Sequence, residues 1–184
     1  MAQTQNKVRI GGGAWRSRLL RFPDVPGLRP TPDRVRQTLF NWLEQDLHGL
    51  VCLDLFCGTG VLGFEALSRG AASAVMVEKS SQAYQGLLES RQLLSADAAQ
   101  ILNIDAEHFL AKNTQPFDII FLDPPFGQGW LPRLLPHIKQ HLAPHGRIYA
   151  EAEQVLLDDD NWQVIKQGKA GNVLFHLLKS ADER

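Results

Sequence analysis

Four acidic residues follow four apolar segments of this 184-residue chain at nearly equivalent points. The segments VCLDL, ASAVMVE, QILNID and FDIIFLD read as strands, and they end at or near Asp54, Glu78, Asp105 and Asp123. Ligands of open α/β sheets bind at the carboxyl ends of the strands. A single surface carboxylate would need no explanation, but four at equivalent strand ends predict one common site.

The last of these acids opens the stretch Asp123-Pro-Pro-Phe126. Consecutive prolines stiffen the backbone and remove N–H donors, which leaves carbonyl oxygens free to accept. Asp123 and the Pro124 carbonyl can accept both hydrogen bonds of an NH2 group, and Phe126 offers a flat face to a ring. This cradle suits a planar molecule with an exocyclic amine, whose lone pair it would aim at an electrophile. The structural alternative is a Pro-Pro turn followed by a core phenylalanine.

A glycine-rich loop follows the first of these strands. Gly58, Gly60 and Gly63 match G-x-G-x-x-G, and Glu78 lies twenty residues after Gly58, as in dinucleotide-binding proteins, so NAD is a candidate ligand. Two features count against NAD. Asp54 precedes the glycines, where a pyrophosphate would be repelled, and hydride transfer gives the proline-rich stretch no role. A positively charged nucleoside without phosphates, such as S-adenosylmethionine, suits the pocket better.

The predicted ligand contacts follow from this choice. The ribose of S-adenosylmethionine would lie at Glu78, its adenine near Asp105 and Ala106, and its methionine end near Asp54. The predicted cofactor-binding residues are Asp54, Phe56, Gly58, Gly60, Glu78, Lys79, Asp105, Ala106 and Asp123. The predicted catalytic residues are Asp123, Pro124 and Phe126. No metal site is expected, because the six histidines form no metal-spaced cluster with the cysteines.

These motifs lie where strands and helices alternate. From Val51 onward the alternation, with helices expected over 80–94 and 130–142, predicts a mostly parallel α/β sheet with right-handed crossovers. The last two segments, WQVIKQGK and NVLFHLLK, are expected to form a hairpin that puts one antiparallel strand at the sheet edge. One domain fits this length. We expect residues 1–30 to form a basic hairpin extension and residues 31–184 to form the main domain.

The net charge of −1 conceals a basic N-terminal end. Residues 1–36 hold eight basic and two acidic residues, a net charge of +6. Charge concentrated in this way can attract a polyanion, although a solubilising tail is the alternative. Thr31 is expected to cap a helix with Pro32 in its first turn. Arg34 and Arg36 lie off the apolar face of that helix and are expected to point outward.

Composition excludes several classes of protein. No run approaches the roughly 20 apolar residues of a membrane span, and the N-terminus lacks the apolar core of a signal peptide. Cys52 and Cys57 form neither a disulfide framework nor a paired metal motif, so the reducing cytoplasm is the expected location. A monomer is the simple expectation.

Together these motifs resemble class I S-adenosylmethionine-dependent methyltransferases, in which DPPF marks the branch that methylates amino groups. More narrowly, the chain resembles the RsmD family of bacterial 16S rRNA guanine-N2 methyltransferases. The matching segments are RIGGGAWRSRLL, LRPTPDRVRQTLFNWL, LDLFCGTGVLGFEALSRGA and FDIIFLDPPF. Cys57 and Thr59 depart from the small Ala and Ser expected in the glycine loop.

The resemblance implies a Rossmann-like, seven-stranded sheet, an N-terminal hairpin that binds RNA, and a guanine flipped into the site. The expected reaction is methyl transfer from S-adenosylmethionine to the guanine N2 amine of 16S rRNA, with an assembled small ribosomal subunit as partner. The hairpin is expected to grip phosphates beside the target base. Adenine-N6 methylation and a non-catalytic RNA-binding module remain open. The predicted RNA contacts are Arg9, Arg16, Arg18, Arg21, Arg29, Arg34 and Arg36.

Overall fold

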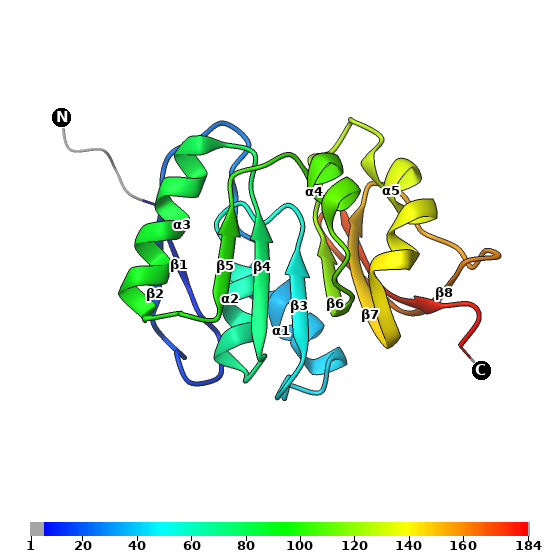
Figure 1. Cartoon of the computed structure of the whole chain (residues 1–184), viewed down its shortest axis with the longest axis horizontal. Coiled ribbons are helices and arrows are strands. Elements are labelled where there is room, and N and C mark those ends of the chain that lie inside the picture. Colours follow the sequence, from blue (N-terminus) through cyan, green and yellow to red (C-terminus); the bar gives the residue numbers. More distant parts are fainter. Residues whose placement is uncertain (1–5, 184) are drawn as a thin grey trace.

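A seven-stranded sheet forms the centre of the computed structural model, which describes residues 6–183 (Figure 1). Its strands are β3 (Val51–Asp54), β4 (Ser73–Val77), β5 (Ala99–Leu102), β6 (Phe117–Leu122), β7 (Leu142–Ala152), β8 (Trp162–Ala170) and β9 (Val173–Ser180). They are ordered β5-β4-β3-β6-β7-β9-β8. The five strands from β5 to β7 pair in parallel, which confirms the predicted mostly parallel sheet.

The C-terminal hairpin is present, but its arrangement differs from the prediction. β9 runs antiparallel to both β7 and β8 and lies between them. The antiparallel strand is therefore internal, and β8 forms the edge. An interior position suits β9, because residues 175–178 are buried. The polar β8, with Lys166, Gln167 and Lys169, suits an edge that faces water.

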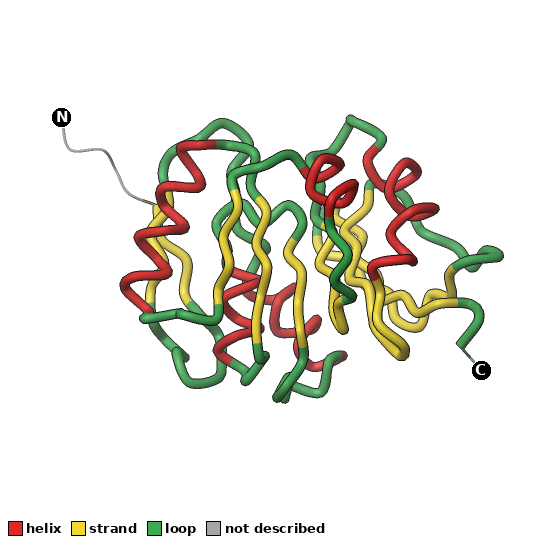
Figure 2. The backbone as a smooth tube through the Cα atoms, viewed as in Figure 1, coloured by secondary structure: helices red, strands yellow, loops and turns green. Residues whose placement is uncertain are grey.

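Helices cover both faces of the sheet (Figure 2). They are α1 (Asp33–Trp42), α2 (Val61–Ser68), α3 (Ser81–Leu94), α4 (Ala106–Lys112) and α5 (Trp130–Ile138), the last continued by a 3-10 turn at Lys139–His141. On one face, Leu39, Phe64 and Leu87 bring α1, α2 and α3 into one core cluster. On the other, Phe109 of α4 and Leu134 of α5 pack against the sheet. Among residues 6–183, no helix is long and apolar enough to cross a membrane.

The N-terminal hairpin packs against this body. β1 (Asn6–Arg9) and β2 (Leu19–Phe22) pair antiparallel, and their Val8 and Leu20 join the same core cluster as α1, α2 and α3. Gly13 fixes the hairpin turn to the end of α2, since the Ala14 N–H donates to the Ser68 carbonyl over 2.7 Å. A Cβ on Gly13, whose φ is +78°, would lie 1.9 Å from that carbonyl oxygen, so only glycine fits. The boundary at residue 30 stays a prediction, and residues 1–5 lie outside the described part.

The entry to α1 differs from the prediction in two ways. The helix begins at Asp33, and Thr31 does not cap it: the Thr31 hydroxyl donates instead to Glu151 Oε1 over 3.2 Å. The prediction that Arg36 points outward is wrong, because Arg36 is only 2% exposed. Its guanidinium pairs with Glu65 of α2 and donates to the Arg9 carbonyl of β1. A guanidinium so buried cannot contact RNA, so Arg36 leaves the set of predicted RNA-binding residues.

Candidate active site

Three of the four predicted acids meet at the carboxyl edge of the central strands, the upper edge in Figure 1. Asp54 ends β3, Glu78 follows β4, and Asp123 follows β6. β3 lies between β4 and β6, and Asp54 stands opposite Met76 of β4 and Phe121 of β6. The topology therefore brings these carboxyls together, as the strand-end pattern predicted.

Asp54 is the most deeply buried of the three. It is 1% exposed, and its Oδ2 accepts a hydrogen bond from the Gly63 N–H over 3.1 Å. Burial raises the pKa of Asp54 to about 7, the Gly63 hydrogen bond opposes this, and the charges of Glu78 and Glu151 add to it. A buried carboxyl poised in this way favours a cationic neighbour.

Two backbone N–H groups, one of them in the glycine loop, hold the side chain of Glu78. The Gly58 N–H donates to Glu78 Oε2 over 2.9 Å, and the Ser80 N–H donates to Oε1 over 2.7 Å. Each carboxylate oxygen retains a lone pair, so the pair of oxygens can accept from the two hydroxyls of a ribose. Gly60 has φ +80°, and a Cβ there would lie 2.5 Å from Leu87, which explains why this turn needs glycine.

Asp105 has a structural task at its strand end. Its side chain caps α4, with Oδ1 accepting from the N–H groups of Glu107 and His108 over 3.0 and 3.3 Å. Its other oxygen lies 3.9 Å from the exposed Lys79 ammonium. Ala106 is buried in the first turn of α4. The predicted contacts of Asp105, Lys79 and Ala106 with an adenine stay predictions, and only Oδ2 of Asp105 is uncommitted to the cap.

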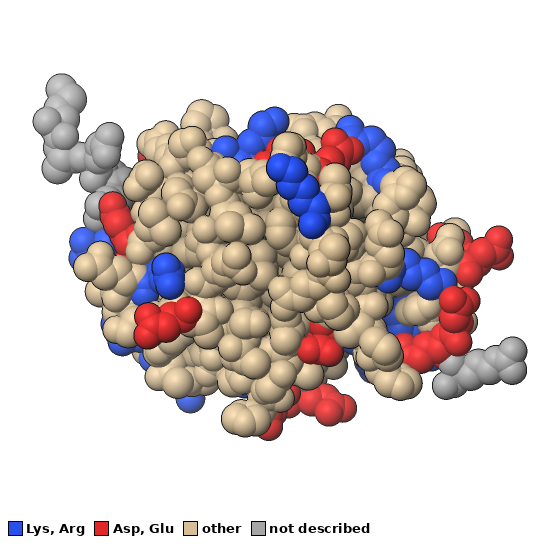
Figure 3. Space-filling view, in the orientation of Figure 1, with Lys and Arg blue, Asp and Glu red and all other residues tan. Residues whose placement is uncertain are grey.

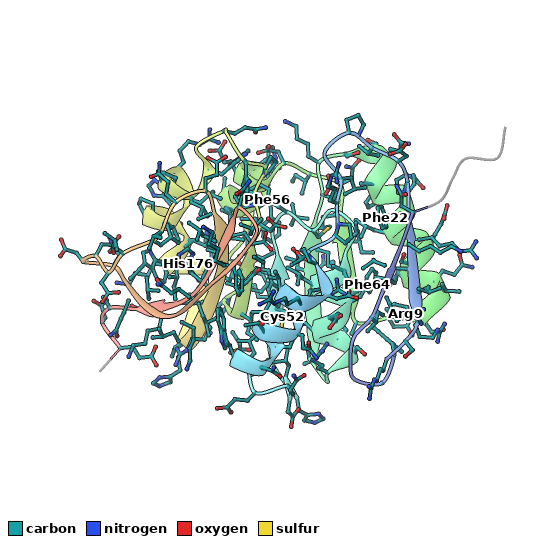
Figure 4. All side chains as sticks on the ribbon, turned by 180° about the vertical axis from the view of Figure 1, so that it is seen from behind. Arg9, Phe22, Cys52, Phe56, Phe64 and His176 are labelled. Carbon is teal, nitrogen blue, oxygen red and sulfur yellow. The ribbon has the colours of Figure 1, made fainter. Side chains whose placement is uncertain are left out.

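The segment that follows β6 at Asp123 has a stiff, proline-rich backbone and carries an exposed aromatic ring. Asp123 is half-buried, Pro124 is buried, and Phe126 is 44% exposed. Phe56 lies at the sheet edge, as Figure 4 shows, and its ring meets Trp130 of α5 edge-on, with centroids 5.1 Å apart. The sequence analysis missed Trp130. Trp130 is distant in sequence from the glycine loop, so the sequence alone does not predict its contact with Phe56.

Glu151 is a further acid that the sequence analysis missed. It lies near the end of β7, is 5% exposed, and its Oε1 accepts from the Tyr149 hydroxyl over 2.8 Å as well as from Thr31. It also lies within hydrogen-bonding reach of Asp123, and burial raises the pKa of both carboxyls. The sequence does contain a signal for Glu151, because the segment RIYAE is another apolar run that ends in an acid.

The remaining predicted RNA-binding arginines are all exposed. Arg18 donates to the Leu93 carbonyl in the last turn of α3, and the neighbouring turn residue Trp15 bonds to Ser68 at the end of α2. Because these helices run against the parallel strands, their last turns lie at the amino edge. Arg16 and Arg18 therefore lie far from the carboxyl acids, contrary to the expected position beside the target base. Figure 4 shows Arg9 on the hairpin, lower than Phe22 and Phe56.

Two arginines lie closer to the acids. Arg29 is flanked by Leu28, whose side chain would lie 3.1 Å from a Cβ on Gly58, and by the segment leading to Thr31. Arg34 occupies the first turn of α1. Figure 3 shows Lys and Arg atoms along the upper, carboxyl edge of one face. The RNA contacts of Arg9, Arg16, Arg18, Arg21, Arg29 and Arg34 stay predictions.

The sheet order, the glycine loop and the strand-end acids define a Rossmann-like methyltransferase fold. Residues 8–179 match the model of a family described as "Conserved hypothetical protein 95", the RsmD family, and the chain belongs to this family. It is 42% identical to the "Ribosomal RNA small subunit methyltransferase D" of Escherichia coli K12, over 94% of this chain and 90% of that one. The protein of the same name from Haemophilus influenzae is 38% identical, with 97% and 98% covered.

A solved structure agrees with this assignment. The Escherichia coli protein yhhF superposes with a TM-score of 0.86 at 38% identity, covering 95% of this chain and 98% of that chain.

Proposed function

We propose that this protein transfers a methyl group from S-adenosylmethionine to the exocyclic N2 amine of a guanine in 16S rRNA. Its relatives at 42% and 38% identity are named small-subunit rRNA methyltransferases, and they support a methyltransferase that acts on rRNA. One observation supports the choice of donor and target amine. The chain leaves β6 through the rigid Asp123-Pro124 segment, which lies beside Asp54 and is followed by an exposed Phe126.

The chain's own residues would hold and orient the amine. Asp123 and the Pro124 carbonyl accept from its two N–H bonds, and Phe126 stacks on the base, an interaction worth roughly 1–3 kcal/mol. Acceptors on both N–H bonds draw the nitrogen toward a pyramidal geometry, with its lone pair directed at the ligand site beside Asp54. Such positioning can supply much of the rate of a bimolecular transfer.

The residues at the edge of the sheet fit S-adenosylmethionine. When bound, this cofactor supplies an electrophilic methyl group on a sulfonium. Glu78, held by Gly58 and Ser80, has acceptors for the ribose hydroxyls, and the buried carboxyl of Asp54 favours the cationic methionine end. Among residues 6–183, no group of three His, Cys, Asp or Glu side chains could hold a metal ion.

The substrate we propose is an assembled or partly assembled small subunit. The chain offers few elements that could read a base sequence, and phosphate contacts position an enzyme without reading sequence. Shape must then supply the specificity, and rRNA folded onto ribosomal proteins has the best-defined shape. The enzyme would act in the cytoplasm with this substrate, and the buried free thiols of Cys52 and Cys57 suit that reducing location.

The test compares small subunits and protein-free 16S rRNA, both from a strain lacking the gene. We expect methyl incorporation at a guanine N2 on subunits, and much slower incorporation into protein-free rRNA. Asp123→Ala should slow single turnover by about a hundredfold or more, because alanine cannot accept from the amine and position it, with little change in cofactor affinity. The matched control is Asp118→Ala, on the same strand but facing the Val51 N–H. Methylation of adenine, or an unimpaired Asp123→Ala variant, would contradict the proposal.

A further inference from the structure

Glu151 is a buried carboxyl with no part in the reaction described so far. β7 pairs with β6 in parallel, and Leu122 stands opposite Ala150. The next residue on each strand is therefore an acid, Asp123 beside Glu151. Glu151 is 5% exposed, and an acid at such a position is rare unless it is paired.

The partners of Glu151 are groups that can donate or share a proton. The Tyr149 hydroxyl donates to Oε1 over 2.8 Å and the Thr31 hydroxyl over 3.2 Å. Asp123 lies within hydrogen-bonding reach of the Glu151 carboxyl and of Thr31. Two carboxyls this close can hydrogen-bond to each other only when one of them carries a proton.

The surrounding charges favour retention of that proton. Asp54 on β3 faces both carboxyls, and its own neighbour Glu78 adds negative charge. The ion pairs that Lys and Arg form within residues 6–183 include neither Asp123 nor Glu151. Arg36 of α1 donates to the Thr31 carbonyl, but its ion pairs are with Asp33 and Glu65. Burial and the charges of Glu151 and Asp54 raise the pKa of Asp123, and burial raises the pKa of Glu151.

We propose that Glu151 is a positioning residue for methyl transfer: it shares one proton with Asp123, keeps the other Asp123 oxygen directed at the amine, and lets Asp123 take the proton that the methylated amine releases. The inference rests on the proposed function and deepens it. The resting pair carries one negative charge, and its geometry is fixed by Thr31, just before α1, and by Tyr149 of β7.

The proton balance is simple. The amine nitrogen forms its bond to the methyl carbon, the carbon–sulfur bond breaks with its electrons remaining on sulfur, and the nitrogen becomes cationic. The outer oxygen of Asp123 takes one proton from that nitrogen, while the shared proton moves to Glu151. The pair then holds two protons and no charge, and it returns one proton to water after the product leaves.

The test is the pH dependence of single-turnover methylation by Glu151→Gln. In the wild type, activity should fall on the basic side as the pair loses its shared proton, a step that repulsion between the two carboxylates separates from the first protonation step by about one pH unit or more. Glutamine donates to Asp123 without titrating, so this basic limb of the profile should disappear, while the acidic limb, the protonation of Asp123, should stay close to its wild-type position. The KM for subunits and the affinity for S-adenosylhomocysteine should change by less than about twofold, since neither ligand is proposed to touch Glu151.

Tyr149→Phe provides a second variant, in which the basic limb should remain but move. The Tyr149 hydroxyl lowers the pKa of Glu151, so its removal should move the basic limb to higher pH. The matched control is Glu153→Gln, an exposed acid two residues further on, which should leave the profile unchanged. A purely structural role for Glu151 predicts lower stability in both variants and an unchanged profile. A basic limb that stays in place in both variants would overturn the inference.

A measurement without substrate separates the two proposals. Carbon-13 spectra of the Asp and Glu carboxyls in the ligand-free protein should show two titration steps at Asp123, and only one in Glu151→Gln. Disappearance of the resonance in Asp123→Asn assigns it. A wild-type protein that does not methylate 16S rRNA would overturn the proposed function. A single titration step at Asp123 in an active wild-type protein would overturn the inference alone.

Discussion

At the scale of single residues, Asp54 links the charge of the ligand to the proton balance of the site. Its pKa of about 7 means that the carboxyl is a mixture of neutral and ionised forms near neutral pH. A cation held beside it stabilises the ionised form and lowers this pKa. Binding of a ligand with a positively charged amino group should therefore expel a proton, and affinity should fall as the pH drops below about 7.

Calorimetry of S-adenosylhomocysteine binding at pH 7, in two buffers of different ionisation enthalpy, measures this release. We expect a net release of protons by the wild-type protein, because burial keeps part of the Asp54 population protonated until the cation binds. Asp54→Asn should release almost none and bind more weakly. The exposed Asp97→Asn is the control and should match the wild type. Equal proton release from the Asp54→Asn variant would remove Asp54 from the ligand site.

At the scale of elements, Arg36 joins three segments that are distant in the chain. Its guanidinium contacts the β1 carbonyl of Arg9, the acid Asp33 at the start of α1, and Glu65 in α2. Glu65 also accepts from the Gly11 N–H over 2.7 Å, and it pairs with Arg69. The hairpin is therefore held to the helices through a buried charge network as well as through its apolar side chains.

Arg36→Met should destabilise the protein by about 3–5 kcal/mol, the usual effect of removing one partner from a buried ion pair. Urea unfolding measures this directly. Arg34→Met, an exposed change on the same helix, should alter the free energy of unfolding by less than about 0.5 kcal/mol. If the two variants are equally stable, the network contributes little to the attachment of the hairpin.

The elements that the sequence predicted well are those with long apolar patterns. The parallel strands and the helix over 80–94, observed as Ser81–Leu94, are examples. The helix α4 was missed because it has only seven residues, and its cap Asp105 looked like one more site acid. Arg36 was assigned to the RNA surface because nothing local separates a buried arginine from its exposed neighbours. Its partner Glu65 lies 29 positions away, and Thr31 lies 120 positions from Glu151. Such pairings are set by the tertiary fold.

At the scale of the whole molecule, the exposed arginines suggest an RNA footprint with two parts. Arg29 and Arg34 lie on the side of the strand-end acids, whereas Arg16 and Arg18 lie at the opposite edge. Contacts at the first part would lie beside the target base. Contacts at the second would lie across the molecule and add affinity through distant phosphates.

We expect both parts to contribute to the salt dependence of small-subunit binding. Replacing Arg29 and Arg34 with Ala, or Arg16 and Arg18 with Ala, should each reduce the slope of log affinity against log salt by about 0.7–0.9 for every phosphate that is no longer neutralised. Lys166→Ala on the edge strand β8 is the control. Affinity for S-adenosylhomocysteine should stay constant in all variants. A slope unchanged by the Arg16 and Arg18 pair would confine the footprint to the carboxyl edge.

The internal position of β9 also constrains the order in which the protein can fold during synthesis. The ribosome releases β8 before β9, yet β8 pairs with β9 and with no other strand of residues 6–183. β8 therefore has no partner strand, and the edge of β7 stays unpaired, until β9 emerges and pairs with both strands. Until that moment a nascent chain would expose a long unpaired edge on β7, which is the kind of surface that chaperones cover and that promotes aggregation.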